Sequence, residues 1–160
     1  MISLFLDPGD AAGSALFFVR ALLRCDNHPH MAKRAGRAAC IAHAKALPVP
    51  DLVVIEDWPI FASNSKRATA TQHERRGEMV GIAEVLWPGA RIEALPVAQW
   101  QAIHAGHADP TSEGRSLAVV LRYLNGRPVD LHWRGAKGGI VGDAVSAAAM
   151  GVWWWTLRGR

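Results

Sequence analysis

The stretch Ile2-Ser3-Leu4-Phe5-Leu6-Asp7-Pro8-Gly9 decides how this 160-residue chain begins to fold. Its apolar run predicts a buried strand over residues 2–6, and the Pro-Gly pair predicts a turn directly after it. A second apolar run over residues 14–19 is expected to pair with the first as a hairpin. Residues 21–25 either continue that strand or form a short third one. Asp7 is therefore placed at the end of a buried strand, at the lip of the hairpin.

A second buried strand delivers an acidic residue in the same way. Residues 52–55 are all apolar, and Glu56 follows them directly. Before this strand, alanines recur at helical spacing over residues 31–47 and predict a helix, which Pro48 and Pro50 end. Because Glu56 and Asp7 stand in the same relation to their strands, they are the first indication of a functional site.

The remaining elements alternate between helix and strand. The expected order is a helix over 67–86, a strand over 91–95, a short helix over 97–103, a helix over 116–124, an edge strand over 129–133 and a last helix over 142–157. This order predicts one α/β domain over residues 1–160, with a mixed sheet flanked by helices, and excludes an all-β sandwich.

Composition narrows the class of partner and compartment. The formal charge of +4 and the high isoelectric point favour an anionic partner, although such an excess also occurs on proteins that bind no nucleic acid. Only Cys25 and Cys40 are present, and no secretory leader is evident, so we expect a reducing cytoplasm. The longest apolar segment, residues 144–157, is too short to cross a bilayer, so no membrane partner is expected.

Asp7, Glu56 and Asp143 form the candidate site. Two carboxylates at strand ends and a third at the start of a late helix are the oxygen ligands that Mg²⁺ or Mn²⁺ takes in proteins that hydrolyse phosphodiesters. Asp143 has an alternative role, because an aspartate at that position can also cap the helix.

Three short motifs resemble those of the RuvC-type Holliday junction resolvases. Leu4-Phe5-Leu6-Asp7-Pro8-Gly9 followed by Gly13 is similar to their opening motif, Val53-Val54-Ile55-Glu56 to their second, and Gly142-Asp143-Ala144-Val145 to their last. The resemblance spans nearly the whole chain. It implies a ribonuclease H-like fold with a mixed five-stranded sheet flanked by helices, and Asp7, Glu56 and Asp143 as catalytic, metal-binding residues.

The resemblance also implies an activity. A homodimer would resolve branched DNA, the Holliday junction, by two-metal hydrolysis with Mg²⁺ or Mn²⁺, in a bacterium or in the bacterial host of a virus. Two alternatives stay open: a ribonuclease H or other structure-selective nuclease, and a catalytically impaired protein that only binds junctions.

The chain departs from the resolvase pattern at one ligand. Relatives carry a further acidic or histidine ligand three residues before the helix aspartate, where this chain has Ile140; in the other alignment, the later ligand would be Ser146. The substitutes to consider are Asp130, His132 and Asp10. Relatives also place a lysine where this chain has Gln99-Trp100-Gln101, and their hairpin region has three strands where only two are certain here.

Basic and aromatic residues supply candidate DNA contacts. Phosphate contacts are expected from the cations on the helix after Glu56 and from the segment Glu113-Gly114-Arg115-Ser116, and base stacking from an aromatic in the preceding loop. The predicted DNA-binding residues are Phe61, Lys66, Arg67, Arg75, Arg76 and Arg115. A solvated helix face is the competing interpretation for the helix cations, and core packing for Trp58.

Two further groups of residues have structural interpretations. Adjacent residues of a helix point about 100° apart, so at least one of Trp153, Trp154 and Trp155 is expected to be exposed or to pack on a partner subunit. The histidine pairs 28/30 and 104/107 lack the further ligands of a zinc site and are expected to be loop residues.

Overall fold

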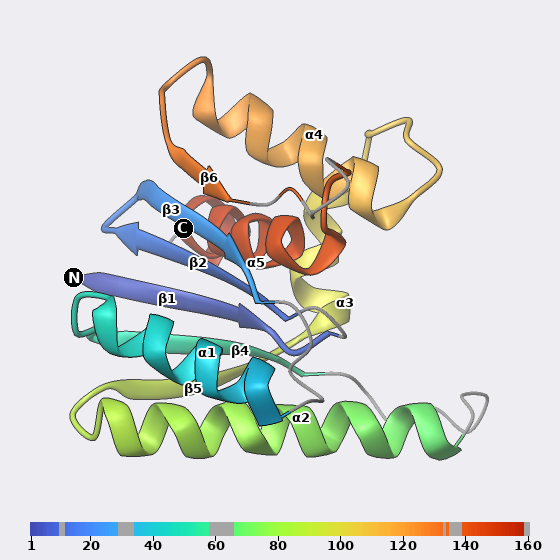
Figure 1. Cartoon of the computed structure of the whole chain (residues 1–160). Coiled ribbons are helices and arrows are strands. Elements are labelled where there is room, and N and C mark those ends of the chain that lie inside the picture. Colours follow the sequence, from blue (N-terminus) through green and yellow to red (C-terminus); the bar gives the residue numbers. More distant parts are fainter. Residues whose placement is uncertain (10–11, 29–33, 58–65, 133, 135–138, 159–160) are drawn as a thin grey trace.

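The computed structural model of the chain describes residues 1–9, 12–28, 34–57, 66–132, 134 and 139–158 (Figure 1). Its centre is a six-stranded sheet in the order β5-β4-β1-β2-β3-β6. The strands are β1 (Ile2–Asp7), β2 (Gly13–Phe18), β3 (Ala21–Asn27), β4 (Leu52–Asp57), β5 (Arg91–Pro96) and β6 (Asp130–His132).

The sheet is mixed, as predicted, but has one strand more than the expected five. β1, β2 and β3 form an antiparallel meander, while β4 and β5 add to β1 in parallel. The segment after the hairpin is a full third strand, since Ala21–Asn27 pairs along β2. The edge strand predicted over residues 129–133 is observed as β6, which pairs in parallel with β3 and covers its outer edge.

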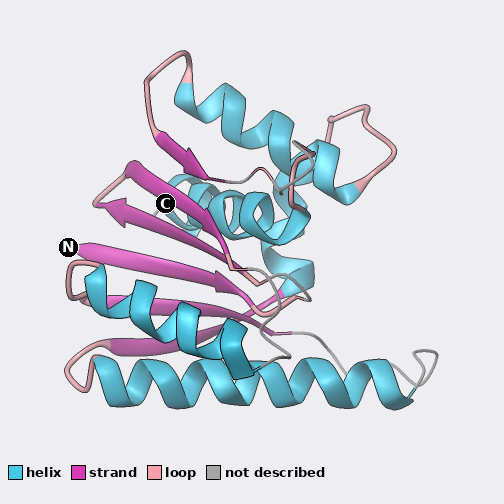
Figure 2. Cartoon of the chain, in the orientation of Figure 1, coloured by secondary structure: helices cyan, strands magenta, loops and turns pink. Residues whose placement is uncertain are grey.

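Helices cover both faces of this sheet (Figures 1 and 2). On one face, α5 (Gly142–Trp153) packs across β1, β2 and β3, and α4 packs on α5; on the other face, α2 packs on β4 and β5, beside α1. The remaining bounds are α1 (Arg34–Ala46), α2 (Lys66–Leu86), α3 (Val97–Trp100), the 3₁₀-helix η1 (Gln101–His104), α4 (Ser112–Leu124) and the π-helix η2 (Trp154–Arg158).

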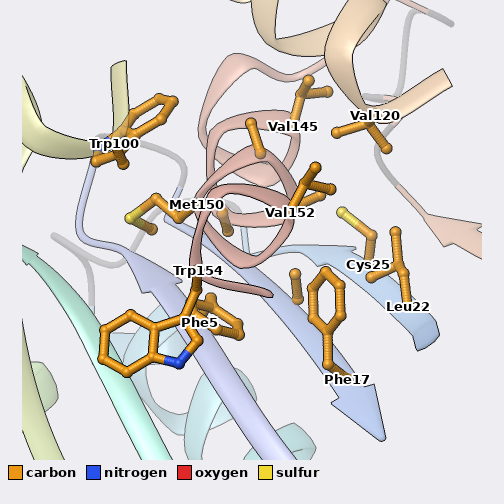
Figure 3. Close-up of a cluster of buried hydrophobic side chains, with 14 of the residues drawn as sticks. Phe5, Phe17, Leu22, Cys25, Trp100, Val120, Val145, Met150, Val152 and Trp154 are labelled. Atoms are coloured by element: carbon orange, nitrogen blue, oxygen red, sulfur yellow. The ribbon is translucent and has the colours of Figure 1, made fainter. Parts of the chain in front are cut away.

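Alternation along the central strands creates two separate cores, because successive strand residues point to opposite faces. In β1, Leu4 packs in the core below α1 and α2, and Phe5 packs in the core below α5. α5 approaches the sheet closely because its buried face is rich in alanine, and Gly151 lies against the ring of Phe17. Figure 3 shows the bulky side chains of this core arranged around α5.

The three consecutive tryptophans at the end of α5 all contact the core of this chain, and a partner contact for one of them stays a prediction. Trp154 is buried and its ring meets Phe5 edge-on, while Trp153 and Trp155 are half-buried against the same core. The terminal turn is a π-helix, which is wider than an α-helix and changes the directions in which its side chains point. No helix among the described residues is long and apolar enough to span a membrane.

Candidate active site

Asp7 and Glu56 lie side by side at the carboxyl edge of two parallel strands. The β1–β4 register pairs Leu6 with Ile55, so the next residue of each strand is the carboxylate. Both side chains point to the α5 face, because Phe5 and Val54, two positions earlier, pack in the core below α5. Asp7 is 5% exposed and Glu56 is 2% exposed. The local pattern of each strand thus puts two acids against each other in a buried position.

Asp143 reaches the same place from the first turn of α5. The helix begins after Val141, which serves as N-cap without a side-chain cap hydrogen bond, so Asp143 is not the cap residue. Its carboxylate lies against the backbone of Gly9, directly after the β1 turn. The capping role considered for Asp143 is therefore wrong, and its side chain lies with those of Asp7 and Glu56. We call the place where these three carboxylates meet the acidic edge.

Two glycines make this approach possible. A Cβ on Gly9 would overlap the Asp143 carboxylate, and a Cβ on Gly13 would overlap the backbone of Asp143 and Ala144. The start of α5 can therefore sit on the β1–β2 turn only because positions 9 and 13 have no side chain. Together the two glycines bring the third carboxylate to the other two.

The three acids perturb one another. Burial raises the pKa of Asp7 well above its usual value, and the charges of Glu56 and Asp143 raise it further. A hydrogen bond between the Asp7 and Glu56 side chains acts in the same direction, while the amide of Gly9, which donates to Asp7 Oδ1 at 3.0 Å, opposes it. A proton shared between Asp7 and Glu56 is thus favoured, and a cation at this edge would replace it.

The donor set suits a hard divalent cation, but the side chains are not yet grouped around one. Carboxylate oxygens are the preferred ligands of Mg²⁺, and mutual repulsion among three of them is relieved by a positive charge. In the part of the chain that the structure describes, no three His, Cys, Asp or Glu side chains are arranged as ligands of one ion. Binding a cation at all three acids requires the Asp7–Glu56 hydrogen bond to open.

Trp100 is a site residue that the sequence reasoning did not identify. Its indole Nε1–H donates to Glu56 Oε1 at 2.9 Å, and the ring is 1% exposed. β5 runs parallel to β4 and pairs Leu95 with Glu56, so α3, which follows β5 directly, begins beside the carboxylate. A tryptophan one helical turn after a strand of a parallel pair was the available signal. In the sequence, the segment Gln99-Trp100-Gln101 stood out only because relatives carry a lysine there.

Solved structures share this arrangement of elements. The structure of Thermus thermophilus RuvC in complex with a Holliday junction substrate matches with a TM-score of 0.62 at 19% identity, over 94% of this chain and 92% of that one. A second T. thermophilus RuvC structure matches with a TM-score of 0.58 at 16% identity, over 96% and 95% of the two chains. This chain has the RuvC-type fold. Its sequence matches no family model and no curated protein.

The RuvC-type fold puts limits on the substitutes for the missing ligand. Ile140 is half-buried and forms a β-bridge with Arg134. His132 is exposed on β6, three strands from β1, which is roughly 14 Å at about 4.8 Å per strand and too far to share an ion with Asp7. Ser146 is half-buried on α5, one turn after Asp143. Asp10 and the Asp130 side chain lie outside what the structure describes.

The predicted DNA contacts of this chain fall into three groups. Arg76, half-buried on α2, pairs with Asp57 at 3.2 Å. Asp57 directly follows Glu56 in β4, so its side chain points to the opposite face of the sheet, and this ion pair lies on the α2 face, away from the three acids. Arg75 is half-buried on the same helix. The Arg115 guanidinium donates to the carbonyls of Asp109 and Pro110, at 2.9 and 3.1 Å, and is thus held by its own loop. Phe61 and Trp58, and the side chains of Lys66 and Arg67, lie outside the described part.

The histidines form no metal site among the described residues. His104 bonds through Nε2 to Ser116 Oγ at 2.9 Å, and His28 through Nε2 to Ser14 Oγ at 2.7 Å. Both are buried, and burial lowers the pKa of each, that of His28 to about 4. Both rings are neutral and hydrogen-bonded at neutral pH. His104 lies in η1, so the prediction of a loop residue is wrong for it, whereas His28 directly follows β3 in a loop but is buried.

Proposed function

We propose that this protein is a divalent-metal-dependent endonuclease that cleaves branched DNA. The observation that carries the proposal is the convergence of Asp7, Glu56 and Asp143 at one edge of a RuvC-type sheet. Burial and then the charges of Glu56 and Asp143 raise the pKa of Asp7 there. Perturbed acids placed together in this way mark functional sites more often than structural ones. A RuvC of the same fold has been solved with a Holliday junction substrate, which supports the same class of substrate here.

The proposed roles follow from the position of each side chain. Asp7 and Glu56 would hold a Mg²⁺ or Mn²⁺ ion from the strands, and Asp143 from α5. A divalent cation held there supplies positive charge to the phosphoryl group and lowers the pKa of the attacking water. Arg76, which pairs with Asp57 on the α2 face, would contact a backbone phosphate outside the metal site.

Cleavage assays with two substrates test this proposal. Wild-type protein is expected to cut a four-way DNA junction with Mg²⁺ or Mn²⁺ and not in EDTA. Glu56→Gln keeps the shape of the side chain and removes its charge, so it should abolish cutting while the protein still folds and binds the junction. Glu84→Gln, at an exposed position of α2, is the matched control and should cut normally.

The outcomes separate the alternative activities. Cleavage of an RNA:DNA hybrid in preference to the junction would assign a ribonuclease H activity instead. Junction binding without cleavage, with either metal, would indicate a protein that only binds. Metal-dependent cutting by Glu56→Gln at the wild-type rate would refute the site.

A homodimer is part of the proposal, because two sites are needed to cut two strands of a junction symmetrically. The tryptophans offer little surface for this interface, since Trp154 is buried and Trp153 and Trp155 are half-buried against their own core. The groove between α1 and α2 is a better place for it: it is lined by apolar side chains that include Ile41, Ile82 and Val85, and Val85 is 80% exposed. Light scattering at micromolar concentration should give a dimer mass for the wild type and a monomer mass for Val85→Glu. A monomeric wild type, with and without junction DNA, would contradict it.

A further inference from the structure

One polar contact of the acidic edge comes from outside the three carboxylates. The Trp100 Nε1–H donates to Glu56 Oε1 at 2.9 Å, and both side chains are almost fully buried. An indole nitrogen is a donor only, so the direction of this hydrogen bond is fixed. A buried acceptor left without a donor is costly, and no solvent can take the place of the indole here.

The Trp100 indole is itself held in place by the His104 ring. The His104 ring meets it edge-on, with 5.3 Å between the ring centroids and 83° between the planes. His104 is anchored in turn by its hydrogen bond to Ser116 on α4, and Ser116 is fully buried. Burial, and then the charges of Arg115 and His107, lower the pKa of His104, so a neutral ring supports the indole at neutral pH. The series Ser116, His104, Trp100 thus forms a rigid support that ends on Glu56.

The other flank of the indole is packed as well. Trp100 belongs to the core around α5 (Figure 3), the helix that carries Asp143. Because the ring is locked between α5 and η1, it cannot turn away from Glu56 without disturbing both. The donor is therefore preorganised, and its geometry does not depend on a bound ligand.

We propose that Trp100 is a positioning residue for Glu56, whose carboxylate it fixes at the acidic edge for a divalent cation. A neutral donor fits this task, because it orients the carboxylate without cancelling the negative charge that a cation needs. The indole also cannot titrate, so the donor is present at every pH. This inference rests on the proposed metal site.

Trp100→Phe tests the role, because phenylalanine keeps much of the ring and removes the N–H. Mn²⁺ binding to the purified protein, measured by calorimetry without DNA, is expected to weaken about 10- to 100-fold, the usual effect of losing a group that orients a ligand. On a four-way junction, kcat should fall while the KM for DNA stays unchanged. Trp87→Phe, at a buried tryptophan of the core below α1 and α2, is the matched control and should leave the Mn²⁺ affinity within about twofold.

The results distinguish this role from the function on which it rests. If the wild type binds Mn²⁺ and Trp100→Phe binds it equally well, the positioning role is wrong and the nuclease proposal stands. If the wild type neither binds Mn²⁺ nor cuts, both are overturned.

A measurement on folded wild-type protein covers the case in which Trp100→Phe fails to fold. The NMR resonance of the Trp100 indole N–H should shift on titration with Mg²⁺, and should also shift in Glu56→Gln. An indole resonance that responds to neither would refute the role.

Discussion

Replacing Asp7 with asparagine should stabilise the protein without metal and abolish its response to metal. In the structure, Asp7 is buried between two acids, and its raised pKa means that its ionisation opposes folding. For a carboxyl group whose pKa is raised by folding, the contribution to stability is complete below the usual pKa and is lost as the pH rises through the raised value. Wild-type protein at pH 8 without metal therefore carries this cost, and Asp7→Asn does not.

The size of the gain follows from the contacts that asparagine can make. Its Oδ1 can still accept from the Gly9 amide, as Asp7 Oδ1 does at 3.0 Å, and its Nδ2 can donate to Glu56 without a shared proton. A hydrogen bond to a charged group contributes about 1.5–3 kcal/mol, so the gain should be about 2 kcal/mol. For a chain of this length, that raises the melting temperature by about 4–8 °C.

Thermal melts in EDTA and in saturating Mn²⁺ measure both effects. A cation present at about a hundred times its dissociation constant stabilises the wild type by about 2.7 kcal/mol, and the variant has lost a ligand for it. The order of the two melting temperatures should therefore reverse: the variant melts higher in EDTA, and the wild type melts higher with Mn²⁺. A variant that melts lower in EDTA, or a wild type that gains nothing from Mn²⁺, would refute the reasoning.

Three further predictions concern other parts of the structure. Asp143→Asn should lose cleavage while its melting temperature stays unchanged or rises slightly, because Asp143 is not the helix cap and its charge faces Asp7; normal cutting would remove it from the site. Gly13→Ala should lower the free energy of unfolding by about 1–3 kcal/mol and reduce cleavage, because the added methyl group meets the backbone of α5. Gly89→Ala is the control and should do neither, because a Cβ at position 89 would have no neighbouring atom within 4 Å. Burial, and then the charge of His43, lower the pKa of His28 to about 4. The contribution of His28 to the free energy of unfolding is therefore complete above pH 6.5 and should decline by up to about 3 kcal/mol as the pH falls towards 4. Urea unfolding at a series of pH values measures this decline, and the same decline in His28→Gln would exclude His28 as its cause.

Local sequence patterns were enough to predict the central strands and the acids at their ends. The apolar run before Asp7, the turn at Pro8-Gly9 and the apolar run before Glu56 are local signals, and the strand that each predicts is observed. The resemblance to RuvC-type resolvases, read from short motifs around the same residues, predicted the fold that the solved structures share. These inferences succeeded because the spacing of apolar residues and the residues that form turns can be recognised within a few neighbouring positions.

The surroundings of those acids depend on contacts between distant parts of the chain. Trp100 donates a hydrogen bond to Glu56, which lies 44 positions earlier in the chain. Gly13 is required because a side chain there would overlap the start of α5, far along the chain. The sequence likewise left open whether residues 21–25 continue the second strand, and only the pairing along β2 shows that Ala21–Asn27 is a strand of its own. Such contacts depend on strand register and helix packing across the whole sheet, and no local pattern contains them. The sequence therefore identified the charged groups of the site, and the folded chain determined the neutral groups that hold them in place.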